Sequence, residues 1–196
     1  MTQIKRIDTP LAGACVIQMT RHEDERGFFM ETYNRRDLEE AGISADFVQD
    51  NVSRSVKGTV RGLHYQKMFP QDKIVRVCLG EIYEVIVDIR EESPTYGKWF
   101  STVLTDASNE QLFVPGGFAH GFLVLSDEAE ISYKTTDFYH PEDEYGIIWN
   151  DPGLGIDWPV TKTDGQWTLE DGTPLIISAK DEEWPVLMAG KDGLDK

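Results

Sequence analysis

The sequence predicts a mainly-β protein built as a sandwich or a barrel. Three observations lead to this fold class. Apolar and polar residues alternate with a period of two over most of the chain, strand-like runs recur at near-regular spacing, and clusters of turn-forming residues separate them. At 196 residues the chain fits one domain with a substantial core, so we expect residues 1–196 to fold as a single domain.

One helix is expected near the N-terminal end. Asn34 can cap it, Asp37 lies in its first turn, and Gly42 can end it. Leu38 and Ala41 would form its buried edge. We therefore expect a short helix before the main run of strands.

Strand-like runs are expected over most of the chain. Residues 73–79 and 82–89 alternate most clearly, and Gly80-Glu81 between them predicts a tight hairpin. Further strand-like runs are residues 61–66, 99–104, 111–114, 121–125 and 130–135. After Pro141 the chain becomes acidic, aromatic and rich in loops, and we expect this last part to wrap over the β-domain.

Charge is distributed unevenly along the chain. It has 19 basic and 35 acidic residues, a net charge of −16, which argues against a general nucleic-acid-binding surface. Residues 52–79 are the exception, because they include six basic residues and one acid, Asp72. These six are Arg54, Lys57, Arg61, Lys67, Lys73 and Arg76. Such a local excess of cations predicts a binding surface for an anion.

Neither a membrane protein nor a disulfide is indicated. No apolar run approaches membrane-spanning length, and residues 1–10 have no apolar signal core. Cys15 and Cys78 lie far apart, each among apolar neighbours, so we expect buried free thiols and a cytoplasmic location.

Two histidines lie in strand-like surroundings. His64 follows Gly62 by two residues, so a strand would place both on one face, with Gly62 leaving space above the sheet. Both a proton-transfer base and a structural histidine bonded to a neighbouring strand fit this position. His120 would open the strand after a glycine-rich turn, at the mouth of a barrel.

A metal site is not expected. Metal-binding barrels usually offer a His-x-His pair with a glutamate downstream on the same strand. Here Gln66 stands two residues after His64, and no glutamate follows on that strand. We expect the site to be free of metal.

Three other residues have both a structural and a chemical interpretation. Tyr133 shares a face with Ile131 and Thr135, which fits a core tyrosine or a general acid. Lys73 stands at the start of its strand. It fits either a surface lysine or, if it points inward, an electrophile that stabilises an enolate or a phosphate. Asp181 fits ordinary turn chemistry. Taken singly, none of these residues determines a function.

Taken together, they belong to an ordered series of short motifs. The series covers residues 24–29, 47–51, 61–66, 73–76, 87–90, 93–97, 114–122, 133–134, 148–152, 155–159 and 178–181. In content and order it resembles the dTDP-4-dehydrorhamnose 3,5-epimerase family over about residues 24–181. The resemblance implies a cupin-type jelly-roll barrel or sandwich with a few short helices, and an enzyme that needs no cofactor.

The resemblance also implies a substrate and a role for each matched residue. The substrate would be dTDP-4-dehydro-6-deoxy-D-glucose, a dTDP-4-keto-6-deoxyhexose inverted at C3 and C5. His64 would remove the sugar's α-protons, Asp181 would orient His64, Lys73 would stabilise the enolate oxygen, and Tyr133 would return a proton on the opposite face. The positions that match the nucleotide-sugar pocket are Arg26, Glu31, Gln49, Asn51, Arg61, His120, Tyr139, Glu144 and Lys180.

Members of this family are homodimers in which the N-terminal strands cross. The resemblance therefore implies a homodimer with strand exchange, in which Arg26 and Glu31 serve the partner's site. The cations around His64 would bind the diphosphate of the nucleotide.

Two features depart from the family pattern. Glu84 stands where aspartate is expected, which changes the length of a contact and keeps its charge. Residues 162–173 form a longer stretch than usual before the closing motif. Asp171 in this stretch is a rival to Asp181, although it lacks the Ser-x-Lys-Asp context.

Other functions remain open from the sequence. They are epimerisation at C3 or C5 alone, a ketoisomerase that moves the carbonyl between C4 and C3, a metal-dependent cupin, and a sugar-nucleotide-binding module without catalysis.

Overall fold

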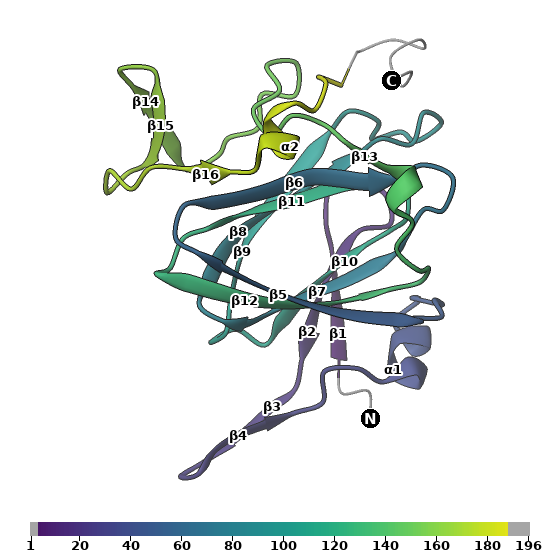
Figure 1. Ribbon diagram of the computed structural model, residues 1–196. Helices are drawn as coiled ribbons and strands as arrows, with labels where there is room; N and C mark the ends of the chain where they lie inside the picture. Colours follow the sequence, from purple (N-terminus) through teal and green to yellow (C-terminus); the bar gives the residue numbers. More distant parts are fainter. Residues whose placement is uncertain (1–3, 188–196) are drawn as a thin grey trace.

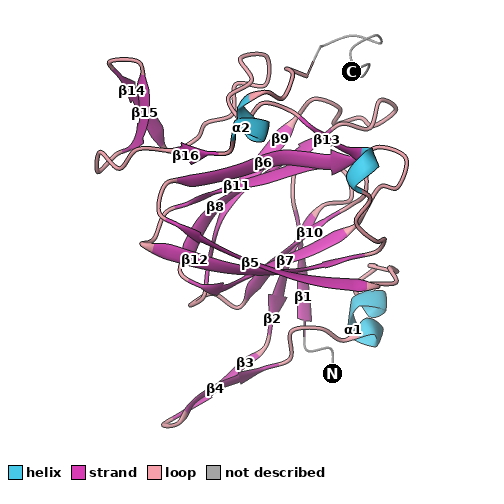
Figure 2. Cartoon of the chain, in the orientation of Figure 1, coloured by secondary structure: helices cyan, strands magenta, loops and turns pink. Residues whose placement is uncertain are grey.

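Two facing β-sheets make up most of the structure, a computed structural model that describes residues 4–187 (Figure 1). The first sheet has the order β1 (Ile4–Asp8), β2 (Cys15–Met19), β10 (Glu110–Val114), β7 (Lys73–Leu79), β12 (Glu128–Thr135) and β5 (Gln49–Val56). The second has the order β13 (Glu144–Gly146), β6 (Thr59–Gln66), β11 (Phe118–Val124), β8 (Glu81–Asp88) and β9 (Trp99–Thr105). These strands are antiparallel to their neighbours, and β16 (Ile176–Ile177) runs parallel to β6. The prediction of a mainly-β fold is confirmed (Figure 2).

Smaller elements lie outside the two sheets. The β3–β4 hairpin (Arg21–Asp24 and Gly27–Met30) projects beyond the first sheet, and the β14–β15 hairpin (Val160–Thr163 and Gln166–Leu169) projects beyond the second (Figure 1). The helical turns are α1 (Arg35–Glu40), the 3-10 turn η1 (Pro141–Asp143) and α2 (Ala179–Glu182). Residues 1–3 and 188–196 of the predicted domain lie outside the described residues, and the assignment of residues 1–196 to one domain stays a prediction.

The expected helix is present as α1. The Asn34 side chain accepts hydrogen bonds from the backbone N–H groups of Arg36 and Asp37, at 3.1 and 3.4 Å. Leu38 is buried against the outer face of the first sheet. Gly42 follows the helix with a φ of +80°, a conformation that glycine adopts without strain.

The core lies between the two sheets and continues on their outer faces. Between the sheets, Val75 and Leu112 of the first pack in one cluster with Ile86 and Phe122 of the second. The C-terminal part covers the outer face of the second sheet, where Trp149 is buried, so the prediction that it wraps over the β-domain is confirmed. Sheets covered on both faces are mechanically suited to hold side chains at fixed positions between them.

The tight hairpin predicted at Gly80-Glu81 is wrong. β7 and β8 lie in different sheets, where β7 pairs with β10 and β12, and β8 pairs with β11 and β9. The connection turns from one sheet to the other, and its backbone N–H groups donate hydrogen bonds to side chains of other loops. Gly80 donates its N–H to Asp106 at 2.9 Å, and Glu81 donates to Ser126 at 2.8 Å. Period-two alternation marks a strand but not its partner, so it could not separate a hairpin from a corner between sheets.

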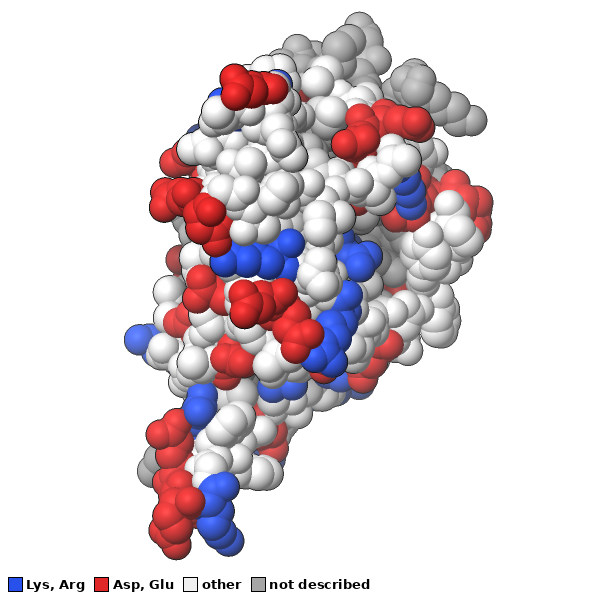
Figure 3. All heavy atoms as spheres, turned by 60° about the vertical axis from the view of Figure 1, so that its left-hand side comes forward, with Lys and Arg blue, Asp and Glu red and all other residues white. Residues whose placement is uncertain are grey.

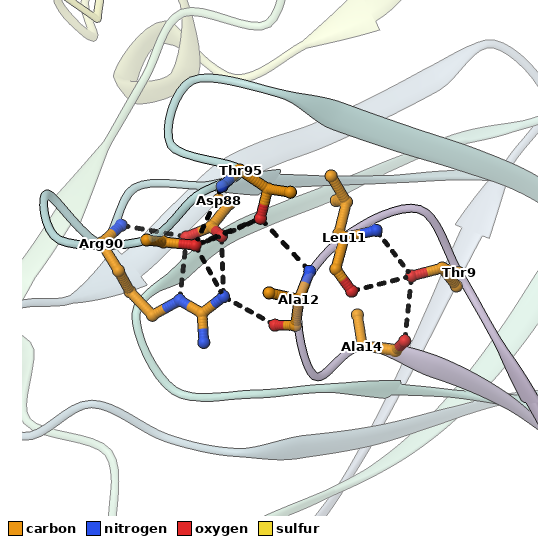
Figure 4. Close-up of polar contacts among 8 residues, drawn as sticks. Thr9, Leu11, Ala12, Ala14, Asp88, Arg90 and Thr95 are labelled. Carbon is orange, nitrogen blue, oxygen red and sulfur yellow. Dashed lines mark hydrogen bonds and ion pairs between the residues drawn. The ribbon is translucent and has the colours of Figure 1, made fainter.

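A polar cluster joins the β1–β2 turn to the end of β8 (Figure 4). The buried carboxylate of Asp88 accepts hydrogen bonds from Arg90 at 2.7 and 2.9 Å, from Ser93 at 2.5 Å and from Thr95 at 2.6 Å. Arg90 also donates to the carbonyl of Ala12 at 2.7 Å, and the Ala12 N–H donates to Thr95 at 3.2 Å. The cluster therefore links segments about 80 residues apart and closes one end of the sandwich.

Both cysteines are free thiols. Cys15 is buried as expected, whereas Cys78 is half-buried. Within residues 4–187, no helix has the length and apolar character needed to cross a membrane.

Candidate active site

A cavity of about 1020 Å³ lies between β5 and β12 of the first sheet and β6 of the second. A smaller cavity of about 200 Å³ adjoins it, because the two have several lining residues in common, among them His64 and Tyr133. Together they bring eleven of the thirteen predicted site residues to one place: Gln49, Asn51, Arg61, His64, Lys73, His120, Tyr133, Tyr139, Glu144, Lys180 and Asp181. Arg26 and Glu31 line neither cavity.

One wall of the cavity comes from three strands of the first sheet. In the register of β5, β12 and β7, Asn51 lies opposite Tyr133, and Thr135 lies opposite both Gln49 and Lys73. Residues two apart on a strand share a face, so these five side chains belong to one surface. The sheet thus presents two amides, a phenol and an ammonium group to the cavity.

The second sheet places two histidines in register on adjacent strands. His64 of β6 lies opposite His120 of β11, and both line the smaller cavity. His120 Nε2 hydrogen-bonds to the buried carboxylate of Glu84 on β8, whose other oxygen has no hydrogen-bond partner among the described residues. The longer side chain of Glu84 therefore still reaches His120.

His64 forms a close pair with Asp181. The distance from His64 Nε2 to Asp181 Oδ1 is 2.5 Å, and the Asp181 side chain is 5% exposed. Ser178 caps α2 by accepting the Asp181 N–H at 3.1 Å, which fixes the backbone that carries the carboxylate. Because Asp181 engages Nε2, the proton of a neutral His64 lies on that nitrogen, and Nδ1 carries the lone pair that can accept a proton.

Asp181 remains a carboxylate despite its burial. Burial opposes its ionisation, but hydrogen bonds from His64, Trp184 and the Gly62 N–H, with the charge of His64, lower the pKa of Asp181 below its ordinary value. An anionic Asp181 stabilises the positive charge that His64 acquires when it takes up a proton. The pair is therefore arranged as a base with a fixed orienting anion.

The predicted role of Gly62 is wrong. A Cβ atom at Gly62 would lie 2.6 Å from the carbonyl oxygen of His120 and 2.7 Å from Gly121 Cα. The glycine therefore allows the backbone of β11 to pack closely against β6, and it leaves no open space above the sheet. Its φ of +110° and a register shift between His120 and Phe122 show why the regular two-residue alternation fails here. The Gly62 N–H instead points to Asp181 Oδ2, at 3.4 Å.

Burial shifts the pKa values of Lys73 and Tyr133. It lowers the pKa of Lys73 to about 8, although the charges of Asp72 and Glu84 oppose the change. Burial also raises the pKa of the Tyr133 hydroxyl, with Arg61 opposing it. At neutral pH, Lys73 is therefore still mostly a cation, and Tyr133 keeps a proton that it can donate.

A hydrogen-bonded group of three residues lies at the mouth of the cavity. Glu144 accepts from the Tyr139 hydroxyl at 2.5 Å and pairs with Lys180 Nζ at 2.6 Å. Tyr139 also donates its backbone N–H to Gln49 Oε1 at 3.2 Å. This group connects the C-terminal part to β5 across the opening.

The same chain matches a family of known enzymes. A family model described as dTDP-4-dehydrorhamnose 3,5-epimerase matches residues 8–189. The chain belongs to the dTDP-4-dehydrorhamnose 3,5-epimerase family. A family member from Methanothermobacter thermautotrophicus is 49% identical over 187 residues, covering 95% of this chain and 96% of the relative. The member from Escherichia coli K12 is 46% identical and covers 90% of both chains.

Solved structures of this epimerase family have the same fold. The dTDP-6-deoxy-D-glucose-3,5-epimerase from Legionella pneumophila, in complex with dTDP-4-keto-L-rhamnose, has a TM-score of 0.85 and 43% identity over 93% of this chain and 92% of its own. A 3′-monoepimerase from Streptomyces bikiniensis, in complex with dTDP-quinovose, has a TM-score of 0.81 and 29% identity over 92% of this chain and 86% of its own. The prediction of a cupin-type jelly roll is confirmed, and the protein is an isomerase.

Asp171 lies away from His64. The stretch expected to depart from the epimerase family pattern, residues 162–173, spans most of the β14–β15 hairpin. Asp171, after this hairpin, pairs with Lys57 at 2.6 Å and lines neither cavity. These residues therefore lie in a projecting hairpin, and Asp181 still contacts His64. That this stretch is longer than in other family members stays a prediction.

Fewer cations line the cavities than the basic segment 52–79 led us to expect. Only Arg54, Arg61 and Lys73 of the six cations line the cavities, and Lys180 joins them from α2. Lys73 and Arg76 are three residues apart on β7, which places them on opposite faces of the sheet. On the face in Figure 3, Lys and Arg lie across the middle of the molecule, interspersed with Asp and Glu.

Trp184 is the residue near the base that the sequence interpretation missed. It donates its indole N–H to Asp181 at 3.1 Å. A tryptophan three residues after a helical aspartate was the available signal, but tryptophan is common in cores and no motif marked it out. Among residues 4–187, no three His, Cys, Asp or Glu side chains are grouped as around a metal ion, and the expectation of a metal-free site stays a prediction.

Proposed function

We propose that this protein converts dTDP-4-dehydro-6-deoxy-D-glucose to dTDP-4-dehydro-L-rhamnose by inverting C3 and C5. The observation that carries the proposal is the His64–Asp181 pair, which lines the same cavity as Tyr133, while His64 also lines the smaller cavity with Lys73. Epimerisation beside a ketone needs a base, an acid on the opposite face and a cation near the carbonyl oxygen, and these residues supply one of each.

The chemistry follows from the ketone at C4. Removing a proton from C3 or C5 gives an enolate with its charge on O4. His64 Nδ1 takes the proton, the electron pair of the C–H bond enters the enolate, and the ammonium group of Lys73 stabilises O4. Tyr133 then donates its hydroxyl proton to the opposite face of the same carbon, and the ketone forms again. Proton exchange with water returns His64 and Tyr133 to their starting states.

The remaining cavity residues support binding of the nucleotide part. A volume of about 1020 Å³ accommodates a nucleotide sugar. Arg61 lines both cavities and is held by its Nε–H, which donates to Ser55 at 3.0 Å, so its guanidinium suits the diphosphate. We assign the other cavity residues of the predicted set, Gln49, Asn51, His120, Tyr139, Glu144 and Lys180, to substrate binding.

We also propose that the enzyme acts as a homodimer with exchanged N-terminal strands. Arg26 lies at the tip of the β3–β4 hairpin, which projects from the sheets, and Phe28 and Phe29 on it are 53% and 71% exposed (Figure 1). Large exposed aromatic side chains on a projecting element support contact with a second copy. In such a dimer, Arg26 and Glu31 would complete the partner's cavity. The free cysteines support a reducing compartment, for which we propose the cytoplasm.

Hydrogen exchange in deuterated water tests the proposed reaction. The wild-type protein should incorporate deuterium from solvent at both C3 and C5 of dTDP-4-dehydro-6-deoxy-D-glucose. Replacing His64 with Asn removes the base, so exchange should fall by at least about a thousandfold, while dTDP binding measured by calorimetry changes little. Folded protein that exchanges neither position would contradict the proposal.

The position of the deuterium separates the alternatives. Label at C3 alone would make the protein a 3-monoepimerase, like the Streptomyces bikiniensis relative. Label at C5 alone would indicate the other monoepimerase, and a ketone moved to C3 would indicate a ketoisomerase. Substrate binding without exchange would leave a sugar-nucleotide-binding module.

A further inference from the structure

Trp184 lies against the residue that orients the proposed base. Its indole Nε1–H donates to Asp181 Oδ1 at 3.1 Å, the same oxygen that binds His64 Nε2. The indole ring also meets the imidazole of His64 edge to face, with ring centroids 6.2 Å apart. Trp184 therefore contacts both members of the pair from one side.

The surrounding backbone holds this indole in place. Gly146 lies directly opposite His64 in the β13–β6 register, and a Cβ atom at Gly146 would clash with the Trp184 ring. The residue after Trp184 is tied down because the Pro185 carbonyl accepts the Ile148 N–H at 2.9 Å. A further anchor follows, where the Leu187 N–H donates to Asp151 at 2.5 Å. The indole therefore packs against the backbone at Gly146, and the hydrogen bonds that follow it along the chain restrict its movement.

Three N–H groups then converge on one carboxylate. His64 and Trp184 donate to Oδ1, and Gly62 donates to Oδ2. A carboxylate with donors on both oxygens cannot rotate freely, and it is less able to take the proton that His64 receives. The indole N–H is the one side-chain donor besides His64 that Asp181 has among the described residues.

We propose that Trp184 is a positioning residue, which fixes the Asp181 carboxylate so that His64 presents Nδ1 to the substrate. This inference rests on the proposed function. It deepens that function, because it assigns the orientation of the base to an indole outside the predicted set of site residues. The indole acts through Asp181 and does not line either cavity.

Replacing Trp184 with Phe tests the inference, because Phe keeps an aromatic ring and removes the N–H donor. We expect kcat for epimerisation to fall about tenfold, the effect of one hydrogen bond, while KM stays within about twofold. The isotope effect on kcat with substrate deuterated at C3 or C5 should increase, because proton abstraction becomes slower relative to the other steps. A purely structural role would leave that isotope effect unchanged.

A matched control and a second variant keep the result interpretable. Trp167→Phe alters a tryptophan that packs on Trp149 in the C-terminal layer and should leave kcat unchanged. Gly146→Ala should displace the indole by a steric clash while Trp184 itself is left unmutated, and it should reproduce the loss of kcat. In a Trp184→Ala background the added methyl group meets no ring, so Gly146→Ala should lower kcat no further.

The outcomes separate this inference from the proposed function. If wild-type protein epimerises the substrate and folded Trp184→Phe matches it in kcat and isotope effect, Trp184 does not position Asp181. Additive losses from Gly146→Ala and Trp184→Ala would also overturn the inference. If the wild-type protein itself exchanges no hydrogen at C3 or C5, the proposed function fails first.

Discussion

At the scale of single residues, the charge of Lys73 depends on its surroundings. Burial lowers its pKa to about 8, and the nearby charges of Asp72 and Glu84 only partly oppose this. A lysine with this pKa is protonated at neutral pH and loses its charge just above it. The proposed electrophile is thus active over a limited range of pH.

We therefore expect the rate of epimerisation to fall above pH 8, as Lys73 deprotonates. Measured from about pH 6 to about pH 10, kcat/KM should decline about tenfold per pH unit on its basic side. The hydroxyl of Tyr133 does not start this decline, because burial raises its pKa further above that of Lys73.

Lys73→Arg is the matched variant. Arginine keeps its charge at all these pH values, so the basic decline should disappear even if the rate is lower throughout. A wild-type profile that stays level up to about pH 10 would show that the charge of Lys73 is not required.

Residue types in a known order predicted the site well, and residue contacts were harder to predict. His64, Lys73, Tyr133 and Asp181 were expected together from their motifs, and the two cavities bring them together. The contact of Trp184 with Asp181 depends on how the chain turns after α2, which no local pattern encodes.

At the scale of elements, strand positions were predictable but strand partners were not. The runs expected at residues 73–79 and 82–89 correspond to β7 and β8 within one residue at each end. Their assignment to opposite sheets depends on contacts with β12 and β11, far along the chain. Alternation reports local burial, whereas pairing is decided by the packing of the whole sandwich.

The Asp88 cluster, which joins the β1–β2 turn to the end of β8, should stabilise the fold less at low pH. Burial opposes the ionisation of Asp88, but hydrogen bonds from Arg90, Ser93 and Thr95 outweigh it and lower the pKa to about 2. A carboxylate with a lower pKa in the folded state stabilises the fold above its unfolded pKa, near 4, and loses that contribution as the pH falls towards 2.

We expect Asp88→Asn to lower the free energy of unfolding by about 2 kcal/mol at neutral pH. Urea unfolding should show this difference shrinking between about pH 4 and about pH 2, because wild-type Asp88 becomes protonated there. The control is Asp50→Asn, which removes an exposed ion pair with Lys134 and should change stability by less than about 1 kcal/mol. A wild-type advantage that persists unchanged at about pH 2 would contradict this account.

At the scale of the whole molecule, the proposed dimer predicts shared sites. If each site uses one chain's His64 and the other chain's Arg26, Arg26→Ala and His64→Asn homodimers should both be impaired. Coexpressed, the two variants form mixed dimers in which one site has both wild-type residues. Such preparations should recover up to about a quarter of wild-type activity, the share expected for random pairing in a twofold dimer.

Two comparisons make this experiment decisive. Mixing His64→Asn with Asp181→Asn, which lie in the same proposed site, should restore no activity in any dimer. Sedimentation should find the wild-type protein as a dimer at the assay concentration. A monomer with full activity, or no recovery in the mixed dimers, would contradict the shared site.

The place of Asp181 in the chain has a consequence for how the enzyme comes into being. Strands β1 to β12 are complete by residue 135, but the carboxylate that orients the base arrives in α2, close to the end of the described chain. Domains are synthesised from the N-terminus, so most of both sheets emerges from the ribosome before this helix does. A growing chain therefore contains the strands that line the cavity well before it contains the carboxylate proposed to orient His64, so proton transfer by His64 has to wait for α2.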